Sequence, residues 1–208
     1  MSYSTSREGA EQFTSALILY DTLHLSPHNL RRSAPLSGLG TSLYETQVYA
    51  QAESVLTLLL TIYIESYGQS HKDTLDTVNR LALCLERGGK VLAAIALCEE
   101  YLNICINALG EADSITQTAT ASLARLKQSV KAYQEAETMY LTAIDFCTKG
   151  RGSKHLQTLS LQEALGGLYI HTERYVEAEA TLQYVLRSYR EVVGKESVEA
   201  GNVLQTLG

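Results

Sequence analysis

The chain has 208 residues, a net charge of −6, and 45% hydrophobic against 19% charged residues. This composition is typical of a folded globular protein, and its acidic balance excludes the basic stripe that binding to a nucleic acid backbone requires. The most apolar run, from Val55 to Ile64, falls short of the roughly 18 residues that indicate a membrane-spanning helix. We therefore expect a cytoplasmic protein whose partner is neither a nucleic acid nor a membrane.

The four cysteines, Cys84, Cys98, Cys105 and Cys147, form no metal-site or disulfide pattern. None belongs to a CxxC pair, and no histidine lies at zinc-finger spacing from them. All four fall at apolar positions of helical patterns, so we expect reduced, unpaired and buried thiols, as in an intracellular protein. The sequence predicts neither a metal site nor a cofactor.

At the N-terminus, residues 1–6 are expected to be loose and residues 7–24 to form a helix. Beyond them the chain contains only two prolines, Pro27 and Pro35. Because a proline costs about 3 kcal/mol inside a helix, this scarcity favours long, uninterrupted helices. We treat residues 7–208 as a single domain.

From residue 29 onward the sequence repeats every 42 residues. One signature starts at Tyr49, Val91, Tyr133 and Tyr175, with an alanine three residues after each start and a glycine nineteen residues after it. A second signature is a leucine followed by a small residue, found at Leu39-Gly40, Leu81-Ala82, Leu123-Ala124, Leu165-Gly166 and Leu207-Gly208. A fixed internal period of this length is typical of helical solenoids.

Each repeat predicts two helices that pack antiparallel, because the links between them are short and polar or glycine-containing. The first helix holds the leucine-small pair, which lets two helix backbones approach closely. The second holds apolar residues at three- and four-residue steps, and its final glycine suits a left-handed cap. The predicted pairs are 29–45 with 49–67, 73–87 with 91–109, 114–129 with 133–149, and 157–172 with 175–193, followed by a lone helix at 197–207.

The pattern resembles the 42-residue tetratricopeptide repeat of the kinesin light chain type. The segments Tyr133 to Ile144 and Tyr67 to Leu75 match the family's two signature stretches. The resemblance implies an all-α fold, a right-handed solenoid of antiparallel helix pairs (a tetratricopeptide repeat superhelix), with the first helices on its concave side. It also implies protein-protein interaction as the activity.

The sequence departs from the family at the asparagine that precedes the leucine-small pair. Gly38, Arg80, Ser122, Ala164 and Thr206 occupy that position. In relatives this asparagine holds the backbone of a bound peptide, so we expect recognition here to depend on side-chain charge and shape instead. His71 and His155 occupy equivalent positions of two repeats, which indicates a structural rather than a catalytic role.

Helical periodicity predicts a mixed, hydrogen-bonding surface on the first helices. Arg80 and Arg125 have the chemistry to pair with carboxylates of a partner. The alternative is that both arginines simply pair with acidic residues of neighbouring helices, such as Asp76, Glu86 or Glu163. The candidate partner-binding residues are Tyr44, Asp76, Asn79, Arg80, Arg125, Gln128, Glu163 and His171.

The sequence favours a scaffold or adaptor that binds a protein or peptide segment on the concave face. A second copy of the chain is an alternative partner. A small-molecule-binding or catalytic solenoid is the competing interpretation. Its only acid/base pair on one face is Glu163 with His171, whose separation of about 12 Å along a helix prevents direct contact. We therefore do not expect an enzyme.

Overall fold

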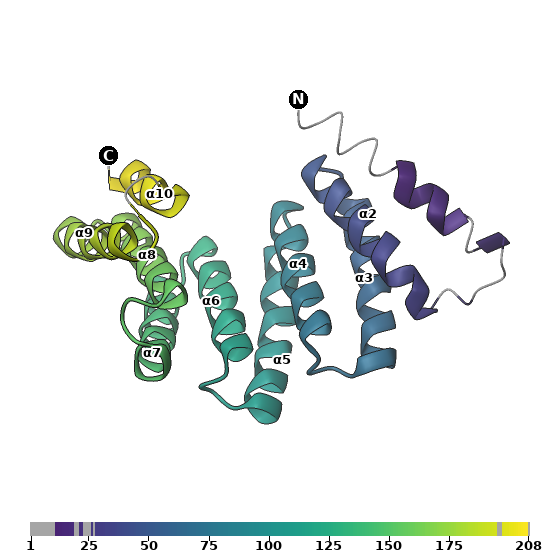
Figure 1. The fold of residues 1–208 in the computed structure, drawn as a ribbon, viewed down its shortest axis with the longest axis horizontal. Helices are drawn as coiled ribbons and strands as arrows, with labels where there is room; N and C mark the ends of the chain where they lie inside the picture. The colour runs from purple at the N-terminus through teal and green to yellow at the C-terminus, as the bar shows by residue number, and fades with distance from the viewer. Residues whose placement is uncertain (1–10, 19–20, 23–25, 27, 195–196, 208) are drawn as a thin grey trace. The chain divides into compact units, whose positions relative to one another are not determined.

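The structure is a computed structural model that describes residues 11–18, 21–22, 26, 28–194 and 197–207. No strand occurs among these residues, and helices joined by short turns make up nearly all of them (Figure 1). The chain divides into two compact units, residues 1–104 and 105–208, with the boundary inside helix α5. The prediction of an all-α fold is confirmed.

The first unit contains a 3₁₀ turn and four helices named from the described residues. Residues 11–18 and 21–22 are also helical, while the rest of the predicted 7–24 helix and the predicted loose end at 1–6 lie outside the described residues. The elements are η1 (Leu30–Arg32), α2 (Ser33–Glu45), α3 (Tyr49–Tyr67), α4 (Lys72–Arg87) and α5 (Val91–Leu109), which continues into the second unit.

The second unit contains two helix pairs and one further helix. The elements are α6 (Ser114–Ser129), α7 (Tyr133–Arg151), α8 (Leu156–His171), α9 (Tyr175–Val192) and α10 (Val198–Leu207). The predicted bounds hold to within two residues at every helix end but one. The exception is the segment 29–45, which the structure splits at Ser33. Pro35 has no N–H to donate to the carbonyl four residues earlier, so the α-helix begins only after a 3₁₀ turn.

Capping residues at 42-residue intervals begin the first helices of the repeats. The side chains of Asn29, His71, Asp113 and His155 each accept a hydrogen bond from the backbone N–H two residues ahead. These bonds satisfy N–H groups that a helix start leaves without partners. The two histidines therefore have the structural role that their repetition predicted.

The first helices end in Schellman motifs, again at 42-residue intervals. The residues at the left-handed position are Gln47, Gly89, Lys131 and Glu173, with φ between 60° and 81°. In the second repeat, for example, Gly89 N–H donates to the Glu86 carbonyl and Lys90 N–H to the Leu85 carbonyl. These two bonds, from Lys90 back five residues and from Gly89 back three, define the Schellman motif.

The glycines that follow the second helices were expected to be left-handed caps, and this expectation is wrong in part. Gly68 and Gly152 do have positive φ, at 89° and 97°, but their ψ angles of 170° and 158° are extended. Only glycine adopts this combination readily, because any Cβ would collide with the backbone. Each glycine closes its helix by donating its N–H to the carbonyl four residues earlier, and its extended ψ then directs the chain out of the helix.

The core rests on small residues at helix crossings. Ala82, Ala124 and Ala136 are fully buried, as the repeat predicted. Gly40 and Gly166 lie against Leu56 and Leu182, so closely that a Cβ on either glycine would stand within 2.8 Å of the leucine side chain. The absence of a side chain at these positions is therefore what permits the two helices to pack.

All four cysteines are buried and none forms a disulfide. Burial raises the pKa of Cys84, Cys105 and Cys147, which disfavours the reactive thiolate. The cysteines therefore serve as small apolar core residues, as the sequence predicted.

Helix α5 is the one described helix that is long and apolar enough to cross a membrane. The segment Val55 to Ile64, which the sequence indicated as the most apolar run, lies in α3 instead. Only 28% of the qualifying window in α5 is buried, and the buried residues include Ala94, Cys98 and Cys105 at helical spacing. Length and composition of a single helix are weak evidence for a membrane span, because core helices of globular proteins meet the same criteria.

The adjacent glycines of α8 provide a test of the packing. A Cβ at Gly166 would lie 2.6 Å from Leu182 Cδ2, whereas a Cβ at Gly167 meets nothing within 4 Å. We expect Gly166→Ala to lower the free energy of unfolding by about 1–3 kcal/mol through overpacking. Gly167→Ala should raise it by about 0.5–1 kcal/mol because alanine favours the helix. Thermal melts of the two variants that shift in the same direction would contradict this packing.

The Schellman motifs give a second test. Gly89→Ala introduces a Cβ at a φ of 81° and should cost about 1–2 kcal/mol of stability. Lys131→Ala is the matched control, because Lys131 is also left-handed and already has a Cβ. We expect this substitution to change stability by less than about 0.5 kcal/mol. Urea denaturation of both variants measures the difference. A loss for Gly89→Ala no larger than that for Lys131→Ala would contradict the cost assigned to a Cβ at Gly89.

Candidate partner-binding site

In the first unit, three helices, α2, α3 and α4, border a mostly apolar cavity of about 280 Å³. Helices α2 and α4 are the first helices of consecutive repeats, so equivalent faces of both border the same space. Leu56 of α3 forms part of the lining. The other lining residues are Gly40, Thr41, Tyr44 and Glu45 of α2, and Arg80 and Leu83 of α4.

Arg80 links α4 to α2 at this cavity. Its Nη1 donates to Ser37 Oγ at 2.8 Å, and its Nη2 donates to the Ser37 carbonyl at 2.7 Å and to Thr41 Oγ1 at 2.5 Å. The two interpretations of Arg80 from the sequence were a partner's carboxylate or a neighbouring acidic residue. The hydrogen-bond acceptors of Arg80 in the structure are neutral oxygens on α2, which position the guanidinium at the cavity, and Asp76 acts on Arg80 electrostatically.

Two N–H groups of Arg80 remain for another acceptor. The Nε–H and one Nη1 proton have no acceptor among the described residues. Burial lowers the pKa of Arg80, an effect that Tyr63 and Asp76 oppose, yet an arginine stays charged in proteins. The site thus combines an apolar hollow with a fixed cation at its side.

Tyr44 contributes the aromatic wall of the cavity. Its ring meets that of Tyr49 edge-on at a centroid distance of 5.8 Å, which restricts its orientation. The two other candidates of this unit lie nearby on α4: Asp76 is exposed one turn before Arg80, and Asn79 is half-buried. Of the four candidates in the first unit, the structure therefore brings Tyr44 and Arg80 to one cavity.

In the second unit, the first helices α6 and α8 are joined by a similar polar link. His171 Nδ1 lies 3.5 Å from Gln128 Nε2 and 2.8 Å from the Gly167 carbonyl. Gln157 Nε2 donates to the Ser114 carbonyl at 3.3 Å and to Thr118 Oγ1 at 3.4 Å.

Gln157 is a residue of this polar link that the sequence pattern did not predict. The signal that could have found it is its spacing: Gln157 is 43 and 39 residues from its acceptors, as Arg80 is from Ser37 and Thr41. Equivalent first helices of two consecutive repeats are therefore bridged in the same way in both units.

Glu163 and Arg125 each have a partner within the second unit. Tyr189 donates to Glu163 Oε2 at 3.3 Å. Arg125 opposes the effect of burial on Tyr140, whose pKa is nevertheless raised to about 12. The hydrogen bonds of Glu163 and of His171 are thus with different residues, and no metal-binding cluster occurs among the residues that the structure describes.

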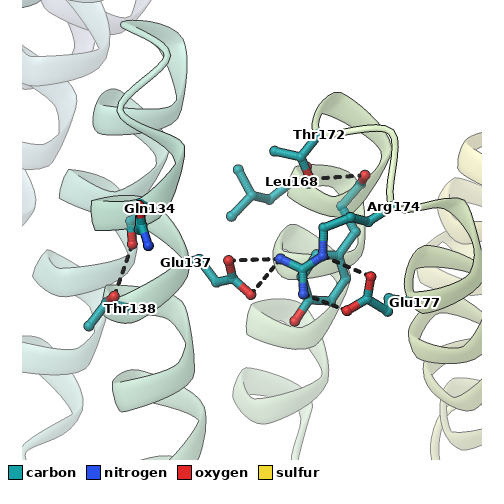
Figure 2. Close-up of polar contacts among 8 residues, drawn as sticks. Gln134, Glu137, Thr138, Leu168, Thr172, Arg174 and Glu177 are labelled. Carbon is teal, nitrogen blue, oxygen red and sulfur yellow. Dashed lines mark hydrogen bonds and ion pairs between the residues drawn. The ribbon is translucent and has the colours of Figure 1, made fainter.

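The second helices of consecutive repeats are connected by ion pairs, whereas the links described above join first helices. Lys90 Nζ lies 2.8 Å from Glu53 Oε2, and Arg174 Nη1 donates to both carboxylate oxygens of Glu137 at 2.8 Å. Figure 2 shows the Arg174 guanidinium held between Glu137 and Glu177. The Arg174 guanidinium also lies 4.3 Å from the centroid of the Tyr169 ring, within cation-π range.

Comparison with known proteins agrees with this architecture. A family profile of the tetratricopeptide repeat matches residues 115–191. Among curated proteins, no sequence matches the chain. Stacked antiparallel helix pairs of this length define a helical-repeat protein. Residues 115–191 therefore match the tetratricopeptide repeat family, and the fold of the chain is similar to that of TPR-like repeats described as kinesin light chain.

Three solved structures illustrate the fold. The TPR-like repeats of a Podospora anserina protein described as a kinesin light chain give a TM-score of 0.78 at 19% identity, covering 91% of this chain and 89% of theirs. BtubC from P. vanneervenii gives 0.70 at 18%, covering 98% and 82%. A Rap protein complexed with Competence and Sporulation Factor gives 0.67 at 14%, covering 99% of this chain and 59% of its own. At these identities the likeness establishes the fold alone.

The environment of Glu163 predicts a pH-dependent effect on stability. Burial raises its pKa, the bond from Tyr189 opposes this, and Glu199 reinforces it. A carboxyl with a raised pKa in the folded state costs stability where it is ionised, and the cost disappears as pH falls through the folded pKa. Glu163→Gln keeps an acceptor for Tyr189, so we expect a higher Tm than wild type at about pH 7 and a shrinking difference toward about pH 4.

The measurement is a series of thermal melts from about pH 7 to about pH 4. Glu179→Gln, at an exposed carboxylate of the same unit, is the control and should show no such trend. A Tm difference for Glu163→Gln that grows on acidification would contradict the assignment.

Proposed function

We propose that the protein is a non-catalytic, cytoplasmic interaction module that binds a protein or peptide segment on the face formed by the first helices. The observation that supports this most directly is the cavity between α2 and α4, with Arg80 beside it. Tetratricopeptide repeat folds generally mediate protein-protein interaction, and the Rap protein of similar fold has been solved with Competence and Sporulation Factor bound.

The chemistry of the cavity suits one side chain of a partner segment. Ligand pockets for small molecules usually measure about 300–1,000 Å³, whereas this cavity is about 280 Å³ and mostly apolar. An aliphatic or aromatic side chain can fill it against Tyr44, Leu56 and Leu83. A neighbouring carboxylate or backbone carbonyl of the same segment can then accept from the remaining N–H groups of Arg80.

Of the residues that the sequence nominated, Tyr44 and Arg80 are the proposed contacts at this cavity, with Asp76 and Asn79 at neighbouring positions of α4. In the second unit, Gln128 and His171 offer a smaller polar surface, and Arg125 and Glu163 remain proposed contacts there. Removal of Arg80 is a poor test of binding, since Arg80 also links α4 to α2. A substitution that fills the cavity but keeps Arg80 separates a loss of binding from a loss of the link between α4 and α2.

The test is selection of peptides from a random displayed library on the immobilised protein. We expect enriched peptides to pair an apolar residue with a nearby Asp or Glu. The variant Leu83→Arg should weaken a selected peptide at least about tenfold in Kd, equal to about 1.4 kcal/mol, by occupying the cavity. Leu92→Arg, at an exposed position of α5 outside the cavity lining, is the matched control and should bind as wild type does.

Salt provides a second readout with the same peptides. Exposed charge contacts are screened over about 8–10 Å at 0.1–0.15 M ionic strength, so affinity should fall as salt rises. Titration calorimetry measures both effects. Peptides that bind Leu83→Arg and wild type equally would place recognition elsewhere on the chain.

A further inference from the structure

Three groups of different chemistry follow one another along the side of α4 that borders the α2–α4 cavity. Leu83 lines the cavity, Arg80 lies one turn before it, and Asp76 lies one further turn before Arg80. Residues three or four positions apart share one face of a helix. At about 1.5 Å of rise per residue, the three groups span about 10.5 Å along the helix axis. This face of α4 thus presents an apolar, a cationic and an anionic group in that order.

The Asp76 carboxylate is available to a ligand. Asp76 is exposed, and its side chain forms no hydrogen bond or ion pair with the residues that the structure describes. Its one interaction there is the electrostatic attraction to Arg80. The hydrogen bonds of Arg80 to Ser37 and Thr41 hold the guanidinium toward α2 instead. The cation and the anion therefore remain separate features of the surface.

The charge of Asp76 limits which segments Arg80 can accept. A partner carboxylate that accepts from Arg80 lies about one helical turn from Asp76, and like charges at that separation repel each other. A second acidic residue on the same side of the segment would add to this repulsion, whereas a lysine or arginine there would pair with Asp76. Asp76 therefore disfavours an acidic run and favours a basic residue after the acidic one.

The separation of the three groups suits a segment in extended conformation. Residues two apart in an extended chain point to the same side, and each step rises by about 3.3 Å. Three side chains on one side of such a segment therefore span about 13 Å, compared with about 10.5 Å from Leu83 to Asp76 along α4. A long partner side chain such as lysine readily covers the difference of about 3 Å.

We propose that the α2–α4 site selects a partner segment in which an acidic residue stands between an apolar and a basic residue, with one residue separating each from the next. The apolar side chain fills the cavity beside Leu83, the acidic one accepts from Arg80, and the basic one pairs with Asp76. This selectivity rests on the function proposed above, because it concerns the same cavity. It adds the order of charges in the partner and a role for Asp76.

Three displayed peptide libraries test the order of charges on the immobilised full-length protein. Each surrounds a fixed core with random residues and contains that core in both chain directions. The cores are apolar-x-acidic-x-basic, apolar-x-basic-x-acidic and apolar-x-acidic-x-acidic, where x is any residue. We expect the first library to be enriched most. In fluorescence anisotropy, its best peptide should bind at least about tenfold more tightly than two altered versions, one with the charges exchanged and one with the basic residue changed to glutamate.

Reversing the charge of Asp76 makes the test specific to this residue. The variant Asp76→Lys should bind the best peptide at least about tenfold more weakly than wild type does, and it should bind the glutamate version more tightly than wild type does. Glu100→Lys, the same charge change at an exposed position of α5 outside the cavity lining, is the control and should keep the wild-type order of affinities.

The outcomes separate this inference from the function on which it rests. Stronger enrichment of the second or third library, or an Asp76→Lys variant that keeps the wild-type order of affinities, would overturn the charge order and leave peptide binding at the cavity intact. Enrichment of no library would overturn both.

Discussion

The close approach of the two helices in each repeat is the constraint on which the structure depends. Gly40 against Leu56 and Gly166 against Leu182 leave no room for a Cβ, and the other repeats place a buried alanine at the same position. A hairpin of two helices cannot bury its own apolar surface, so its neighbour must complete the core. The spacing of the helices fixes which side chains of consecutive repeats can meet.

The polar contacts follow from that spacing. Once equivalent helices stand one repeat apart, residues 37, 39 or 43 positions apart in sequence come within hydrogen-bonding distance. Arg80 and Gln157 use the longer intervals to bridge first helices, and the Glu137–Arg174 pair uses the shorter one to bridge second helices.

The turns show how one backbone geometry tolerates several residues. Four first helices end at a left-handed residue, yet only one of these positions is glycine. The two hydrogen bonds of the Schellman motif, together with the packing of the helices on either side, offset the cost of a Cβ there. In contrast, the extended ψ after α3 and α7 is practically restricted to glycine, which explains why the sequence repeats glycine at that place and not at the other.

The sequence by itself determined the helical class, the 42-residue period, nearly every helix boundary and the buried small residues and cysteines. These features are local or periodic, and helix formation and burial follow from patterns within about 20 residues. Only the tertiary structure decided that Arg80 donates to Ser37 and Thr41, that Gln157 bridges α6 and α8, and that Tyr44 and Arg80 border one cavity. Those contacts join residues tens of positions apart, and their partners depend on side-chain geometry, which a one-dimensional pattern does not specify.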